Sequence, residues 1–501
     1  MSCTFKAGKL LQGKMAYNGQ ERKRSALCLW PLCLKEMVDK DTVRAFPPPG
    51  RKDIAHRNWT EGSILKNVLL LSWPMAVTQT VMALGPTIDI IWVGRLGAAA
   101  VAGVGISGVA MQFMMSLMMG LFQGMRALIA RAVGSKDMET AHLVAQQSIV
   151  ISAMLAAVMA IIGHFFSEEI LRLITPDPEI VRLGTAYLSI AFIGGATMVF
   201  RMMLDAIMQA SGDPMNPMWI AIIYRLLHVI LCPFLIFGWW IFPELGVRGA
   251  AYTGVIAQGL GVVLGLGVLL TARSRISLSF RGFRFDAGII WRILRIGLPA
   301  SVTGVQQSLN QFILQIFMAL FGAAALAAHV ITMRLEMFIF MPAMSFGMGA
   351  GVLVGQNLGA RQPERAERSA WIAAGFVEAF VIAVSLVIFI WIGPVVHLFS
   401  AEPAVDILAR QFIYIAMLGW IVMGFLFVLM SGLQGAGDTL PPMVISITTT
   451  WLVTVPLAYF LSHHTSSGAV GVRWAITASV LIGAAIILIY FRTGKWKWRR
   501  V

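Results

Sequence analysis

One carboxylate, Asp89, stands inside a long apolar run that begins near Val68. An ionised carboxylate in hydrocarbon is strongly unfavourable unless it is paired or hydrated, so acids within membrane segments usually serve a function. We interpret Asp89 as a titratable site for a coupling proton or a sodium ion. The alternative is a structural carboxylate that is paired with a basic residue or lies at a hydrated helix end.

A second group of reactive side chains lies in the apolar run over residues 216–241. Tyr224, His228 and Cys232 are spaced by four residues, which places them on one face of a helix. An imidazole near the middle of a membrane can hold or pass a proton near neutral pH. His228 is therefore a second candidate for cation coupling, with Tyr224 and Cys232 lining a cavity beside it. The alternative is a neutral histidine bonded to a backbone carbonyl.

Three further charged residues could partner these groups. Arg225 is a possible counter-ion for Asp89 or for Asp205, and the sequence alone does not choose between them. Arg201 and Asp205 are four residues apart, a spacing that favours an intrahelical ion pair with a structural role.

Amides replace apolar side chains on one face of a later segment. They follow a helical i, i+3, i+4 and i+8 spacing, at Gln307, Asn310, Gln311 and Gln315. Neutral amides can line a hydrated cavity or bind substrate without titrating, and we favour this interpretation. The alternative is hydrogen bonding between helices, a common use of Gln and Asn in membrane spans.

The elements that carry these residues are apolar helices. The chain is 58% hydrophobic and 13% charged over 501 residues, and its mean hydropathy is +0.78. Continuous apolar runs of this length indicate membrane-spanning helices and not barrel strands, which would alternate in polarity. The sequence predicts an all-α integral membrane protein. Its twelve expected helices lie near residues 67–94, 101–128, 141–164, 183–208, 216–241, 248–272, 294–320, 325–354, 370–393, 410–434, 443–462 and 474–492.

An internal repeat relates the two halves of the chain at a constant offset of 225 residues. The matches include Pro74 with Pro299, Gly97-Ala98-Ala99 with Gly322-Ala323-Ala324, Gly134 with Gly359, Gly212-Asp213 with Gly437-Asp438, and Gly246-Val247-Arg248 with Gly471-Val472-Arg473. Because six helices are an even number, the halves form parallel lobes, as in two-lobed transporters that bind substrate between lobes and alternate access. Asp89 is not repeated, since its counterpart is Leu314. We expect a disordered cytoplasmic tail at 1–60, lobes at 61–272 and 296–492, a linker at 273–295 and a basic tail at 493–501.

Charge is distributed as membrane topology requires. The net charge is +15, and the cationic residues gather in the tails and in alternate connections. The connection after the second helix holds Arg126, Arg131 and Lys136. Cationic connections stay in the cytoplasm, so both termini are predicted to be cytoplasmic. The bilayer, and not nucleic acid, accounts for this charge.

Catalytic and cofactor motifs are missing from the sequence. Four cysteines, Cys3, Cys28, Cys33 and Cys232, are too poorly spaced for a disulfide framework or a zinc site. The chain has no phosphate-binding loop of the GxxxxGK[ST] type. We expect no enzymatic activity, no cofactor and no resident metal.

Three stretches resemble the multidrug and toxic compound extrusion (MATE) transporter family: "LSWPMAVTQTVMALGPTIDIIWVGRLGAAAVAGVG", "VGQNLGARQPERAER" and "LQGAGDTLPPM". The resemblance covers about residues 60 to 490. It implies a monomeric antiporter in the inner (plasma) membrane of a bacterium or archaeon, which exports amphipathic or cationic compounds in exchange for a cation. The alternative is a flippase for a lipid-linked precursor, of a related fold.

The resemblance also assigns residues. Asp89 matches an acid of the family's first helix that is implicated in proton or sodium coupling. Many members carry Asn and Asp four apart in the fifth helix, where His228 and Cys232 stand here, and Gln307 stands where one branch has Glu. Imidazole and thiol are poor ligands for a hard Na⁺ ion. The departures therefore favour proton coupling by Asp89 with His228, although Na⁺ stays possible.

Overall fold

The computed structural model describes residues 57–271, 274–278, 283–400 and 402–499. Most of the tail expected at 1–60 lies outside this range. Its last residues do not: Trp59 is buried, and its indole Nε1 donates to the carbonyl of Gly212 at 2.9 Å. Within the described residues all regular structure is helical, which confirms the predicted class.

The first lobe is built from helices that precede residue 271. They are α4 (Ile64–Val93), η3 (Gly94–Leu96), α5 (Ala98–Gly134), α6 (Met138–Phe165), α7 (Ser167–Arg172), α8 (Pro178–Ile193), α9 (Gly195–Ser211), α10 (Met215–Phe237) and α11 (Val247–Leu270). The second lobe contains α12 (Ala287–Ala319), α13 (Ala323–Gly359), α14 (Pro363–Ile390), α15 (Ile392–His397), α16 (Pro403–Gly435), α17 (Leu440–Thr448), η4 (Thr449–Thr454), α18 (Val455–His463), α19 (Gly468–Arg492) and η5 (Lys495–Trp498).

The repeat is visible in the helix ends. At the offset of 225, the ends of α6, Met138 and Phe165, fall on Pro363 and Ile390, the ends of α14. The short helices α7 and α15 correspond in the same way. The parallel two-lobed repeat is thus confirmed as a property of the fold.

Eleven described helices are long and apolar enough to cross a membrane, or twelve if the bent pair α8 and α9 forms one span. A single helix was expected at 183–208, but α8 and α9 meet at 46°. Consecutive glycines, Gly194 and Gly195, weaken the helix at this point. A Cβ on Gly194 would lie 2.2 Å from Cγ2 of Val255, so α11 packs directly against the break.

Two other expected boundaries differ. The helix expected at 443–462 contains a π-helical segment, Thr449–Thr454, in which the Thr454 hydroxyl donates to the Thr449 carbonyl at 3.1 Å. Such threonine bonds compete with the regular helical pattern. The linker expected at 273–295 is shorter, because α12 starts at Ala287, where the side chain of Asp286 accepts from the amide of Ile289 at 3.0 Å. Arg126 and Arg131 also lie inside α5 and not in the connection that follows it.

The lobes interlock through their first two helices, since α4 packs on α13, α12 packs on α5, and α5 packs on α13. A Cβ on Gly134 would lie 2.0 Å from the Gln356 carbonyl oxygen, and one on Gly359 would lie 2.1 Å from the Arg131 carbonyl oxygen. Arg131 Nη2 donates to the Ala436 carbonyl at 2.9 Å, and Gln356 Nε2 donates to the Ala210 carbonyl at 3.1 Å. These contacts join the lobes near the α5–α6 and α13–α14 connections.

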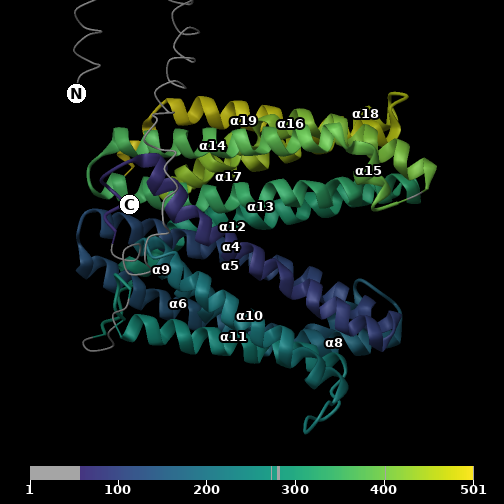
Figure 1. Cartoon of the computed structure of the whole chain (residues 1–501), viewed down its shortest axis with the longest axis horizontal. Helices are drawn as coiled ribbons and strands as arrows, with labels where there is room; N and C mark the ends of the chain where they lie inside the picture. Colours follow the sequence, from purple (N-terminus) through teal and green to yellow (C-terminus); the bar gives the residue numbers. More distant parts are fainter. Residues whose placement is uncertain (1–56, 272–273, 279–282, 401, 500–501) are drawn as a thin grey trace, which may run out of the picture. The chain divides into compact units, whose positions relative to one another are not determined.

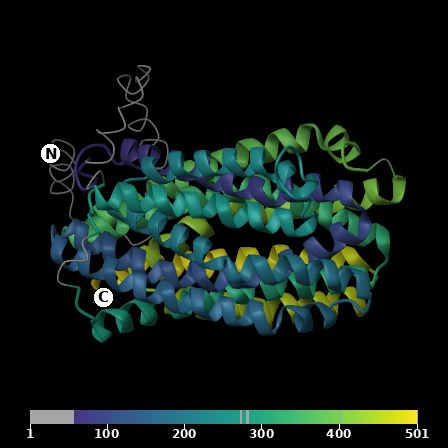
Figure 2. The ribbon, with the colours of Figure 1, turned by 90° about the horizontal axis from the view of Figure 1, so that it is seen from below.

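Figures 1 and 2 show how the long helices run side by side along the molecule. In Figure 1 the two sets of helices come together near α9 and diverge toward α8 and α15. Each lobe has its own buried core, and the core around α13, α14 and α16 also takes in the first half of α4. The end of α4 beyond Asp89 packs in the first lobe, since Val93 shares a core with residues of α5, α10 and α11.

Candidate coupling site

Asp89 lies three residues beyond Pro86 in α4, facing α10. Its Oδ1 is 3.1 Å from Nε2 of His228 and 3.9 Å from Sγ of Cys232, and all three side chains are buried. The expected face of α10 therefore meets the expected acid of α4. Tyr224 is on the same helix but lies elsewhere, beneath two guanidinium groups.

A third helix completes the surroundings of the carboxylate. The phenol of Tyr187, on α8, donates to Oδ2 of Asp89 at 3.4 Å. The sequence analysis missed Tyr187. The internal repeat carries a signal for it, because the residue 225 positions later is Phe412, which has the same ring and no hydroxyl.

Arg225 orients the histidine. Its Nη1 lies 3.2 Å from Nδ1 of His228, while Nε and Nη2 donate to the carbonyls of Val81 and Met82, each at 3.0 Å. The Met82 carbonyl is available because Pro86, four residues later, has no N–H to bond it. A guanidinium only donates, so Nδ1 must accept, and the proton of neutral His228 then sits on Nε2 and faces Asp89.

Gly85 provides the space for this arrangement. A Cβ at position 85 would lie 2.3 Å from Nη1 of Arg225, which is too close unless the guanidinium moves away. The sequence suggested that Arg225 is the counter-ion of Asp89 or Asp205. In the structure its guanidinium bonds His228 and two carbonyls of α4 instead. Arg225 acts on Asp89 through His228, and it binds α4 through backbone carbonyls.

The three donors Asp89, His228 and Cys232 lie within 4.8 Å of one another, close enough to surround a metal ion. An N, O and S donor set is typical of zinc and unlike the oxygen set of Na⁺ or Mg²⁺. A ligating imidazole must present a lone pair, however, and here Nε2 presents its N–H to Asp89 while Arg225 occupies Nδ1. In this arrangement the group forms a hydrogen-bond chain from Arg225 through His228 to Asp89.

The other expected ion pair lies in α9. Arg201 bonds Asp205 through Nη1, both side chains are buried, and Arg201 Nε donates to Gln258 at 3.1 Å. Tyr224 packs beneath two guanidinium groups, with Arg201 at 5.0 Å and Arg225 at 5.4 Å from its ring centre. Asp205 is thus held within its own helix and does not contact Asp89 directly.

The amide face of α12 belongs to the second lobe. Gln307, Gln311 and Gln315 are exposed on the protein surface, and Asn310 is half-buried. Gln306, which the spacing did not select, is the buried amide: its side-chain oxygen accepts from Ser446 at 2.7 Å. The structure therefore keeps the three exposed amides free of the helix packing that holds Gln306.

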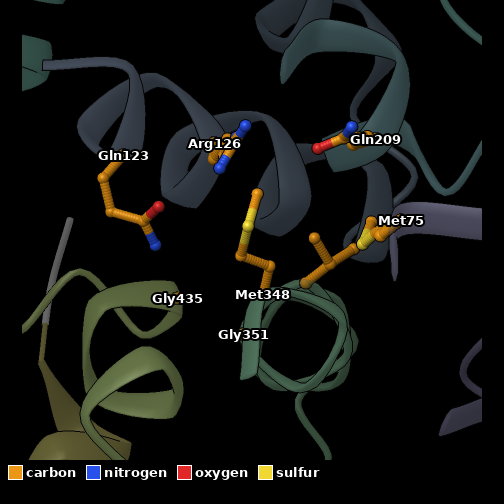
Figure 3. Close-up of a pocket in the computed structure, with 8 residues that line it drawn as sticks. Met75, Gln123, Arg126, Gln209, Met348, Gly351 and Gly435 are labelled. Atoms are coloured by element: carbon orange, nitrogen blue, oxygen red, sulfur yellow. The ribbon is translucent and has the colours of Figure 1, made fainter. Parts of the chain in front are cut away.

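A small pocket lies between the lobes near their closed end (Figure 3). The first lobe lines it with Met75 of α4, Gln123 and Arg126 of α5, and Gln209 of α9; the second lobe lines it with Met348, Gly351 and Val352 of α13 and Gly435 of α16. Arg126 is the one charged residue among them.

Two related halves of apolar spans, interlocked at one end, with the group of Asp89, His228 and Tyr187 in the first half, are the architecture of a two-lobed membrane transport protein. The MatE family model matches residues 74–234 and 299–460, one stretch in each lobe. The chain belongs to this family of membrane transporters.

Two relatives can be aligned with this chain over nearly their full length. The probable multidrug resistance protein YoeA of Bacillus subtilis is 27% identical over 88% of this chain and 96% of the relative. The probable multidrug resistance protein NorM of Thermotoga maritima is 24% identical, over 87% and 94%. A solved structure described as the outward-facing conformation of a multidrug resistance MATE family transporter of the MOP superfamily is 25% identical over 87% of this chain and 96% of that chain, with a TM-score of 0.80.

Proposed function

We propose that this protein exports amphipathic compounds from the cytoplasm in exchange for protons, with Asp89 as the coupling residue. The names of its relatives support multidrug export. The observation that carries proton coupling is the buried Asp89 carboxylate, which accepts from the N–H of a neutral His228 and from the phenol of Tyr187.

These contacts suggest how a proton can act. While Asp89 is ionised, it holds α8 and α10 against the second half of α4 through two hydrogen bonds. A proton on the carboxylate removes its charge and one of its acceptor positions, so both bonds weaken. We propose that this loosening favours substrate release to the outside and return of the empty transporter.

Topology supports the direction of transport. The connections α5–α6 and α13–α14 carry Lys136 and Arg361, and the adjoining helix turns carry Arg131 and Arg365, which predicts that this end is cytoplasmic. The lobes interlock at that end, so the described arrangement corresponds to a state closed to the cytoplasm. We propose a plasma-membrane location with both termini cytoplasmic.

The chemistry of the site disfavours sodium. A Na⁺ ion prefers several oxygen ligands, and the buried group around Asp89 offers a nitrogen and a sulfur in their place. Proteoliposomes containing the full chain and a fluorescent dye test the choice of ion when a proton gradient and a sodium gradient are imposed separately.

Efflux should follow the proton gradient alone, and Asp89→Asn should reduce it to the level of empty liposomes while leaving the protein folded. Glu378→Gln, at a buried acid of the second lobe, serves as the matched control. Sodium-driven efflux, or full proton-driven efflux by Asp89→Asn, would show the proposal to be wrong.

A further inference from the structure

Arg126, a half-buried arginine of α5, differs from three other arginines in the interior of the lobes. Arg201 pairs with Asp205, Arg473 pairs with Glu336, and Arg225 bonds His228 and two carbonyls. The Nε atom of Arg126 is buried without a hydrogen-bond partner, and its guanidinium forms no ion pair with the described residues. A guanidinium that is partly withdrawn from water and lacks an acceptor for a buried N–H is unfavourable, and an opposite charge would compensate it.

The described residues supply that opposite charge only in part. Asp205 attracts Arg126 but is itself bonded to Arg201. Together Arg126, Arg201 and Asp205 carry two positive charges and one negative charge. The second lobe faces this group with Met348, Gly351, Val352 and Gly435, none of which is charged.

The pocket beside Arg126 has a second unsatisfied group. The side-chain oxygen of Gln209 is also buried without a hydrogen-bond partner. In Figure 3, Arg126 and Gln209 lie on the first-lobe side of the pocket, and Met348 extends toward them from α13. The Arg126 guanidinium can bond an acidic group, the Gln209 oxygen can accept from a donor on the same ligand, and the flexible, polarizable methionines can contact its apolar body.

In the closed arrangement the pocket has a volume of about 10 Å³, the room of one water molecule, so a ligand enters only when the lobes separate. The counterpart of Arg126 at the offset of 225 is Gly351, and both residues line the same pocket. The position that carries a guanidinium in one lobe thus carries no side chain in the other. Glycine is also required there for packing, because a Cβ on Gly351 would lie 2.7 Å from the Ser431 carbonyl oxygen.

We propose that the Arg126 pocket binds an oxyanion, a carboxylate or similar acidic group, on the amphipathic substrate. The inference rests on the proposed function and narrows its substrate class to anionic or zwitterionic amphiphiles. When the lobes separate at this end, Arg126 is presented to the cytoplasm and captures the acid.

A matched dye pair tests this directly. Tetramethylrhodamine has a free carboxylate, and its methyl ester has the same ring system without that charge. Binding to the purified full chain in nanodiscs is measured by fluorescence polarization, with no ion gradient. Wild type should bind the acid at least about tenfold more tightly than the ester, the range of a charge-assisted hydrogen bond.

The variants separate the role of charge from a general defect. Arg126→Gln should remove the preference for the acid, and Arg126→Lys should keep part of it, because an ammonium retains the charge but not the planar fork. Arg172→Gln, at an exposed arginine paired with Glu168, is the matched control and should bind as wild type does. Should the Gln variant fail to fold, the wild-type preference and the Lys variant still decide the question.

A competition experiment tests whether the pocket binds an acidic amphiphile or a free oxyanion. Inorganic phosphate at millimolar concentration should displace the acid dye weakly or not at all if the apolar body contributes to binding. Equal affinity of wild type for acid and ester, an unchanged preference in Arg126→Gln, or full displacement by phosphate would each overturn the proposal. None of these measurements depends on proton coupling, so failure of the Asp89 experiment is a separate outcome.

Discussion

The two lobes share a scaffold and differ in their buried charges. Helix ends coincide at one offset, yet the polar group around Asp89 has no equivalent in the second lobe. The residues Asp89, Tyr187, Arg225, His228 and Cys232 correspond to Leu314, Phe412, Thr450, Val453 and Leu457. Every group that could hold or orient a proton in the first lobe is absent from the equivalent place in the second.

The second lobe holds a different pair, between buried Arg473 and half-buried Glu336. Glu336 of α13 bonds Arg473 of α19 and also accepts from the indole of Trp420 at 3.3 Å. The counterparts of Glu336 and Trp420 are Met111 and Gly195. Here a full guanidinium neutralises the carboxylate directly, whereas Asp89 faces a neutral imidazole. The comparison shows that the lobes share their packing, and that the second holds a directly bonded charge pair where the first holds a carboxylate bonded by an imidazole and a phenol.

The largest expected effect comes from breaking the fixed pair. Glu336→Met, the residue of the other lobe, leaves Arg473 buried without its carboxylate, which should destabilise the fold by about 3–5 kcal/mol. Thermal unfolding in detergent measures this loss. Arg248→Gln, at the exposed counterpart of Arg473, should change stability by less than about 0.5 kcal/mol. Equal losses in the two variants would contradict a structural role that is specific to the second lobe.

Substitutions at two glycines where the lobes approach each other closely should have similar effects. Gly134→Ala and Gly359→Ala each push a Cβ onto a backbone carbonyl of the other lobe, which should disfavour the closed end by about 1–3 kcal/mol. Spin-label distances between α6 and α14 should lengthen by similar amounts in both variants. Gly105→Ala, with no atom within 4 Å of the added Cβ, is the control. A shift in only one variant would show that the lobes do not contribute equally to closure.

Much of this molecule follows from its sequence. Long apolar runs and one offset of 225 were enough to predict the two-lobed fold and to single out Asp89 as an unrepeated acid, and the family resemblance then joined Asp89 with His228. Spacing within a helix is a local property, so the four-residue spacing also predicted correctly that Arg201 pairs with Asp205. The same local logic selected Gln307 on α12 and passed over Gln306, because which face is buried depends on the neighbouring helices.

What the sequence did not indicate depends on contacts between helices. Arg126 was interpreted as part of a cationic connection, yet it lies within α5 at the lobe interface, since α5 extends to Gly134. Gly85 was not selected, although it makes room for Arg225. The roles of both residues depend on contacts with other helices: α10 for Gly85, and α9 and α13 for Arg126. Comparing each residue with its counterpart in the repeat, as for Arg126 and Gly351, would have flagged Arg126.

Changing the orientation of His228 should reduce proton-driven efflux less than replacing Asp89 does. Gly85→Ala displaces Arg225, which removes the donor that fixes the imidazole with Nε2–H toward Asp89. Proton-driven efflux should fall by about tenfold, the equivalent of one charge-assisted hydrogen bond, and its pH profile should move. Gly94→Ala, at the end of the same helix with open space around the added Cβ, should retain both rate and profile. An unchanged pH profile in Gly85→Ala would mean that Arg225 does not position the histidine.

The smallest difference between the lobes lies at a helix start. The carboxylate of Asp137 caps α6 by accepting from the amide of Thr140 at 3.0 Å, whereas its counterpart Gln362 makes no side-chain cap on α14. The amide and hydroxyl of Thr140 lower the pKa of Asp137 from its ordinary 3.8, because they bond the ionised form. The cap should therefore act fully above that ordinary pKa and be lost as pH falls through the lower folded value. Asp137→Ala should cost about 1 kcal/mol of stability at neutral pH, with the deficit shrinking in acid, and Gln362→Ala should change little at either pH. Thermal unfolding of both variants at pH 7 and near pH 3 measures the difference, and a deficit that persists undiminished in acid would assign the effect of Asp137 to packing and not to its charge.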